Sequence, residues 1–221
     1  MCVGRMWVCV WGACGYVRGA HVGMCVGRRW FECGAHVVEP LRSRAAQVMA
    51  DPLALAGLTS VVGLLSFALP EREVHGALYS ASINLLDLIC VTEAWPLAYL
   101  HWEMQLLEDL GFGLDLSCCA VSGTTEDLAY VSPKSGRAVA AHHAGRWKTQ
   151  LLPLAPSMIG QSVADNSEIS EGLRTTGHFL EKWLAPSLGD RALPSARKRL
   201  VERLFRTARL EQGPSGEANH E

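Results

Sequence analysis

The 221-residue sequence contains no uninterrupted apolar segment as long as a membrane span requires, about 18 residues. The nearest candidate, 53–69, carries three hydroxyl side chains and lies between Asp51-Pro52 and Pro70. A buried helix explains this segment better than a transmembrane helix. The N-terminal residues also lack a clean apolar stretch followed by a cleavage site. We therefore expect a cytoplasmic protein that does not contact a membrane.

Sequence signatures of catalysis are absent as well. The chain has neither a P-loop nor a dinucleotide-binding fingerprint. Glu103 lies among Leu, Met and Trp on a predicted helix, but no second carboxylate has a spacing that suggests acid–base chemistry. We expect Glu103 to pair with an arginine or to cap a backbone group. The adjacent His142-His143 rings diverge, so they need distant partners to hold a metal ion. The sequence therefore predicts a protein that is not an enzyme.

The eight cysteines form no CxxC pair, and five of them lie within the first 33 residues. Without an export signal, reduced thiols are expected. The same N-terminal segment repeats the string MCVGR at 1–5 and 24–28, and the string GAHV at 19–22 and 34–37. Two interpretations of residues 1–36 remain open. They form a short metal-binding repeat, or they were translated from a shifted frame or a wrong start.

From residue 38 onward the pattern becomes that of a mainly α-helical bundle. Asp51 and Pro52 are a typical N-cap and first helical residue, and Gly111 is a typical helix stop. The apolar spacing predicts helices over 51–69, 74–90 and 92–111, a fourth from Ser167 or Ser170 to about Leu184, and a last one from Pro194-Ser195 to about Leu210. Residues 128–131 and 137–141 are expected to pair as a small β-hairpin around 133–136, with 151–156 as an extended link.

Charge is unevenly distributed along the chain, although the net charge is only −2. The segment 40–190 contains nine basic and 16 acidic residues, whereas 191–209 contains seven basic residues and one acid, Glu202. The sequence therefore predicts an acidic-leaning body with a basic C-terminal helix.

The predicted last helix is amphipathic. Its apolar residues recur at helical spacing and are expected to face the core: Leu193, Ala196, Leu200, Val201, Leu204, Phe205 and Ala208. Its basic residues are then expected largely on the solvent side: Arg197, Lys198, Arg199, Arg203, Arg206 and Arg209. Such a face can neutralise phosphates and bind nucleic acid in a salt-dependent way. It can equally be a solvated face that suits the dipole at the helix C-terminus.

Four segments occur in this order along the chain: VVEPLRSRAAQVMADPLALAGL, WEMQLLEDLGFGLDL, SPKSGRAV and LRTTGHFLEKWL. Through these segments, residues 37–210 resemble the C-terminal, helical part of RecO recombination mediators of the zinc-free kind. The resemblance implies an N-terminal OB-fold that binds DNA, but only 39 residues precede Pro40. The expected division is therefore an aberrant or truncated OB-fold remnant over 1–39, a helical domain over 40–210 and a disordered tail over 211–221.

The resemblance also implies a function and partners. RecO proteins displace single-stranded-DNA-binding protein, anneal complementary strands and act with RecR in DNA repair and recombination. The expected partners are single-stranded DNA, the acidic C-terminal tail of single-stranded-DNA-binding protein, and RecR. Candidate residues for DNA or for the acidic tail are Lys134, Arg137, Arg197, Lys198, Arg199, Arg203 and Arg206.

Zinc-bearing members of that family place two CxxC pairs at positions that read Cys119 with Ser122, and Ala140 with His143, in this chain. Two possible ligands remain where a closed site needs four, so no zinc and no other cofactor are expected. Two other functions stay open. The chain can be a helical module that binds an acidic peptide and no nucleic acid, or a cysteine-rich metal protein.

Overall fold

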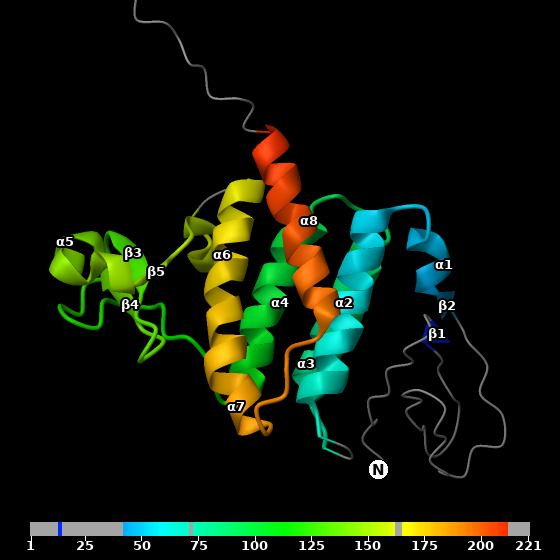
Figure 1. The fold of residues 1–221 in the computed structure, drawn as a ribbon, viewed down its shortest axis with the longest axis horizontal. Coiled ribbons are helices and arrows are strands. Elements are labelled where there is room, and N and C mark those ends of the chain that lie inside the picture. The colour runs from blue at the N-terminus through cyan, green and yellow to red at the C-terminus, as the bar shows by residue number, and fades with distance from the viewer. Residues whose placement is uncertain (1–12, 15–41, 71–72, 162–164, 212–221) are drawn as a thin grey trace, which may run out of the picture.

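The computed structural model describes residues 13–14, 42–70, 73–161 and 165–211 (Figure 1). The predicted OB-fold remnant over 1–39 therefore lies outside the described residues, apart from β1 (Ala13–Cys14). β1 pairs in antiparallel fashion with β2 (Arg42–Ser43), which leads into the short helix α1 (Arg44–Val48). The predicted tail over 211–221 also lies outside the described residues, except at Glu211.

Five longer helices form a bundle, as the sequence predicts. They are α2 (Pro52–Ala68), α3 (Gly76–Ile89), α4 (Trp95–Asp109), α6 (Asn166–Phe179) and α8 (Ser195–Glu211). α8 packs against α2 and α6, while α4 packs against α3 and α6 (Figure 1). None of the described helices has the length and apolar character needed to cross a membrane.

The helix ends follow local sequence signals, with two differences from the prediction: the cap of α6 and the start of α4, which is Trp95 and not Thr92. Asp51 Oδ1 accepts hydrogen bonds from the backbone N–H groups of Leu53 (2.8 Å) and Ala54 (3.2 Å), as expected of an N-cap. α6, by contrast, is capped by Asp165, which accepts from Glu168 N at 2.7 Å. Ser167 and Ser170 were predicted as alternative N-caps of this helix, and this prediction was wrong. Asp165 precedes both serines, and its carboxylate accepts the hydrogen bond from the free N–H group in the first turn. α6 continues through a π-helical segment, η3 (Leu180–Leu184), into α7 (Ala185–Ser187).

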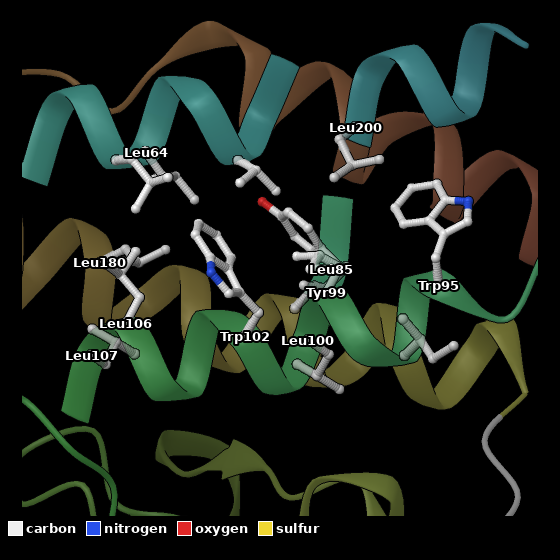
Figure 2. Close-up of a cluster of buried hydrophobic side chains, with 14 of the residues drawn as sticks. Leu64, Leu85, Trp95, Tyr99, Leu100, Trp102, Leu106, Leu107, Leu180 and Leu200 are labelled. Atoms are coloured by element: carbon white, nitrogen blue, oxygen red, sulfur yellow. The ribbon is translucent and has the colours of Figure 1, made fainter. Parts of the chain in front are cut away.

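The core lies where α4 faces the helices around it. Figure 2 shows Tyr99 and Trp102 projecting from one side of α4 toward the neighbouring helices, while Leu100 projects from the other side. Leu106 lies one turn beyond Trp102 on the same helix. All four side chains are buried. Closely packed side chains of this kind fix the helices relative to one another, so the direction of each exposed face is fixed too.

A small three-stranded sheet forms a second lobe beside α6. β3 (Leu128–Val131) and β4 (Ala138–Ala140) form the predicted antiparallel hairpin, and β5 (Leu152–Pro153) pairs with the other edge of β3. The sequence predicted β5 only as an extended link. The short helix α5 (Ala141–Ala144) and the 3₁₀ helix η1 (Gly145–Gln150) connect β4 to β5, and a second 3₁₀ helix, η2 (Pro156–Ile159), follows β5.

The sheet lobe is attached to the bundle through α6, η3 and α4. Thr175 Oγ1 donates a hydrogen bond to the Pro153 carbonyl at 2.6 Å. Gly136, at the hairpin turn, has a φ of +66°, and a Cβ there would lie 3.2 Å from the indole of Trp183. The turn therefore needs glycine both for its backbone conformation and for its close contact with Trp183.

Candidate nucleic-acid interface

The exposed face of α8 carries five of the six basic residues predicted there, and Arg209 is one of the five. Lys198, Arg199, Arg203 and Arg206 are all exposed. Lys198 Nζ lies 4.0 Å from Glu202 Oε1, one turn further along the helix. Arg199 Nη1 donates to Ser195 Oγ at 3.0 Å, and Arg206 Nε donates to the Glu202 carbonyl at 3.3 Å. Among the described residues, no carboxylate forms an ion pair with Arg199, Arg203 or Arg206, so their charge faces solvent.

Arg197 does not belong to this face, so its predicted solvent orientation was wrong. Its side chain is buried, with a relative exposure of 6%, and it forms a two-pronged ion pair with Glu103, which is 0% exposed. Nε and Nη2 of Arg197 donate to the two Glu103 oxygens at 2.8 Å each. The reason is helical spacing: Arg197 lies on the same stripe as Leu200, Leu204 and Ala208, three or four residues apart, and this stripe faces the core.

The Arg197–Glu103 pair is the centre of a buried network that joins four helices. Glu103 Oε1 also accepts from Tyr99 Oη at 2.8 Å, and Oε2 accepts from Thr176 Oγ1 at 2.6 Å. Arg197 Nη2 donates to the Leu173 carbonyl at 2.8 Å, and Ser60 Oγ lies 2.6 Å from Tyr99 Oη. The network therefore connects α2, α4, α6 and α8. The expectation that Glu103 pairs with an arginine is confirmed.

Electrostatics within the network follow from burial and from the Glu103 carboxylate. Burial raises the pKa of Tyr99 well above its usual value, and Glu103 raises it further. Burial alone lowers the pKa of Arg197, but the Glu103 carboxylate outweighs it and the pKa lies above its usual value. Arg197 therefore stays charged and Tyr99 stays neutral, which keeps every hydrogen bond in the network satisfied.

Phe205 was predicted to face the core, and this prediction was wrong. Its side chain is 42% exposed, because it lies one position off the buried stripe of Leu200, Leu204 and Ala208. Near the end of α8, Leu210 is 82% exposed. The exposed face of α8 therefore combines cationic side chains with two large apolar ones.

Lys134 and Arg137 lie on the sheet lobe and not on α8. Lys134 is exposed in the β3–β4 turn, and Arg137 Nε donates to Asp115 Oδ2 at 3.2 Å. α6 contacts both α8 and β5, and it lies between α8 and the sheet in Figure 1. The structure thus divides the predicted basic residues between two surfaces, one on each side of α6.

The positions that resemble a zinc site do come together in part. Cys119 Sγ accepts a hydrogen bond from the Ala140 backbone N–H at 3.3 Å, and Ser122 also donates to it. Burial acts to raise the pKa of the Cys119 thiol, but bonds from the Ser122 hydroxyl and from backbone N–H groups outweigh it and lower the pKa to about 6. Within the described part of the chain, no three His, Cys, Asp or Glu side chains gather where they could hold a metal ion.

The amino-acid sequence of this chain is similar to that of known proteins. A sequence model of the family described as "Recombination protein O C terminal" matches residues 49–194. Proteins named DNA repair protein RecO from Ruegeria sp. (strain TM1040) and Roseobacter denitrificans are 56% and 54% identical over 173 residues. A RecO protein from Jannaschia sp. is 51% identical over the same length. The match covers 78% of this chain and 72%, 72% and 70% of the three relatives, respectively.

Proposed function

Because the chain belongs to the RecO family of DNA repair proteins, we propose that it is a recombination mediator that binds single-stranded DNA through the exposed cations of α8. The family consists of mediators and not of catalytic enzymes, in agreement with the prediction from the sequence. In the proposed role the protein assists recombinase loading and strand annealing, with single-stranded-DNA-binding protein and RecR as partners.

One observation carries this proposal: α8 holds five exposed cations, the four candidate residues and Arg209, while its opposite face packs into the core. Lys198, Arg199, Arg203 and Arg206 project into solvent, and Glu202 is the one acidic residue between Arg191 and Arg209. Cations fixed on one helix face can each neutralise a phosphate and release its counterions. The buried Arg197–Glu103 pair supports this arrangement, because it fixes the rotation of α8 about its own axis.

The test is to titrate fluorescent single-stranded DNA with the full chain at several salt concentrations. For single strands, each phosphate contact contributes about 0.7 to the slope of log affinity against log salt. We expect Arg203→Glu with Arg206→Glu to lower affinity at least tenfold and to reduce the slope by about 1.4, which corresponds to two lost contacts.

The matched control reverses two exposed cations outside α8, Arg174→Glu with Lys182→Glu, which changes the net charge by the same amount. If this control lowers affinity as much as the α8 variant, binding depends on net charge alone and the proposed interface is wrong. Binding that ignores salt altogether would also contradict it.

A second candidate function is supported by the exposure of Phe205 and Leu210. Apolar side chains bordered by cations suit an acidic peptide that ends in an aromatic residue, such as the tail of single-stranded-DNA-binding protein. A pull-down with a peptide of this kind, without DNA, separates the two candidates. Phe205→Ala is expected to weaken peptide binding. If Arg203→Glu with Arg206→Glu leaves DNA affinity unchanged but abolishes peptide binding, the peptide-binding function replaces the first proposal.

A further inference from the structure

The sheet lobe exposes an aromatic side chain that the sequence predictions did not single out. Trp147, in η1, is 51% exposed, whereas the other tryptophans that the structure describes, Trp95, Trp102 and Trp183, are buried or half-buried. Tryptophan has a large apolar surface whose exposure to water is unfavourable. An indole held at the surface is therefore a candidate contact for a ligand.

Two cations lie against aromatic rings at this place. The Arg146 guanidinium carbon is 4.9 Å from the centre of the Trp147 ring, and Lys148 Nζ is 6.0 Å from the centre of the Tyr130 ring. Both distances fall within the range of cation–π contacts, about 6 Å. Two aromatic rings, one on η1 and one on β3, thus each have a cation of η1 against them.

The backbone holds η1 in a defined position. Gly145 has a φ of +44°, which lets the chain turn sharply between α5 and η1, and the preceding Ala144 is buried. At the other end, Leu151 N donates to the Trp147 carbonyl at 3.2 Å just before β5 begins. η1 therefore ends in a backbone hydrogen bond of its own, and the chain continues directly into β5.

The lobe is also free of acidic side chains over a long segment. Residues 128–164 contain four basic residues and no Asp or Glu. The basic residues of this segment are Lys134, Arg137, Arg146 and Lys148. The nearest acid before it, Asp127, has a carboxylate oxygen 3.4 Å from His142 Nδ1. α5, which leads into η1, lies at the end of the lobe farthest from the bundle in Figure 1. Arg146, Trp147 and Lys148 are all exposed to solvent.

We propose that Trp147, with Arg146, Lys148 and Tyr130, forms a second site for single-stranded DNA, where unpaired bases stack on the indole and phosphates contact the cations. Aromatic rings with cations beside them suit the bases and phosphates of a single strand. This inference rests on the proposed function and extends it: the exposed cations of α8 contact phosphates, whereas the η1 site distinguishes a strand with exposed bases from a bare phosphate backbone.

The test compares the affinity of the full chain for an oligothymidine with its affinity for an abasic strand of equal length. Both strands offer the same phosphate contacts. The ratio of the two affinities therefore measures the contribution of base stacking alone. We expect the wild type to prefer the oligothymidine by about tenfold, within the range of base–aromatic stacking. Trp147→Ala should bring the ratio close to one, and Trp147→Phe should retain most of it.

Two matched controls keep this test separate from that of the α8 interface. Val121→Ala removes an exposed apolar side chain, 67% exposed, that lies outside the cluster, and should leave the ratio unchanged. Arg203→Glu with Arg206→Glu should lower both affinities and leave their ratio unchanged. Circular dichroism and thermal unfolding confirm that each variant is folded.

The outcomes are distinct. If the wild type binds both strands equally, or if Trp147→Ala retains the wild-type ratio, the stacking site is wrong while the α8 interface still stands on its own test. If Trp147→Ala weakens binding of an acidic, aromatic-ended peptide and leaves the DNA ratio intact, the site belongs to a peptide and the inference is also overturned.

Discussion

At the scale of single residues, the buried pair of Arg197 and Glu103 is expected to contribute strongly to stability. Arg197 donates two hydrogen bonds to the Glu103 carboxylate, and Thr176 and Tyr99 each donate one more. Removing one member leaves the other charged group buried without its partner. Loss of one partner of such a pair typically costs about 3–5 kcal/mol, far more than loss of an exposed pair.

Arg197→Ala should therefore lower the free energy of unfolding by about 3–5 kcal/mol in urea denaturation. The matched control is Lys198→Ala, the next residue along α8, whose exposed pair with Glu202 should contribute less than about 1 kcal/mol. Arg197→Met combined with Glu103→Leu should recover much of the loss, because no unpaired charge remains. Equal costs for Arg197→Ala and Lys198→Ala would contradict the role of the pair.

Cys119 is the second residue whose environment alters its chemistry. Folding lowers the pKa of its thiol from 9.0 to about 6, since the hydrogen bonds that it accepts favour the thiolate. A group whose pKa is depressed by folding stabilises the native state above its unfolded pKa. That contribution is lost as the pH falls toward the folded pKa.

Thiolate absorbance near 240 nm should accordingly show an ionisation near pH 6 in the folded protein. Cys119→Ser should remove this step, and Cys118→Ser should leave it in place. The stability of the wild type relative to Cys119→Ser should rise between about pH 6 and pH 9. If the difference in stability between the wild type and Cys119→Ser does not change with pH over this range, the Cys119 thiolate does not form.

At the scale of elements, close packing of α4 against α6 depends on a glycine. A Cβ at Gly172 would lie 2.5 Å from Cδ2 of Leu100, whose side chain is fully buried and has little space to move. Gly76, at the start of α3, has no heavy atom within 4 Å of the same position. The two glycines thus differ in packing, although both lie in helices.

Gly172→Ala should destabilise the protein by about 1–3 kcal/mol, as overpacking of a core does, despite the better helix propensity of alanine. Gly76→Ala should be neutral or stabilising by up to about 1 kcal/mol, because alanine restricts the unfolded chain without a clash. Thermal unfolding of both variants measures the difference. If both substitutions stabilise the protein, α4 and α6 are packed less tightly than the structure indicates.

At the scale of the whole molecule, two lobes present two cationic surfaces on either side of α6. The bundle presents α8, and the sheet lobe presents η1, while the Gly136–Trp183 contact and the Thr175–Pro153 hydrogen bond connect the lobes. The sequence predicted an acidic-leaning body and a basic last helix. This prediction describes only part of the charge distribution. The acid-free segment 128–164 adds a second positive region within that body.

Much of the fold could be predicted from local sequence. Apolar spacing, Asp51-Pro52 and Gly111 placed the helices within a few residues, because caps and amphipathic stripes depend on neighbours along the chain. The hairpin followed from two short strand-like segments around a Pro–Gly turn. β5 was missed as a strand, since two residues carry no periodicity and pair only because β3 offers a free edge.

The sequence by itself determined which helices form and that α8 is basic, since these depend on spacing and composition. Only the tertiary structure decided which of the basic side chains of α8 remain exposed to solvent. Arg197 is removed from the surface because Glu103, 94 positions earlier in the chain, projects from the facing helix α4. Trp147 remains at the surface, on η1, where it lies outside the buried core. Such pairings join residues distant in sequence, so one-dimensional patterns contain no direct record of them.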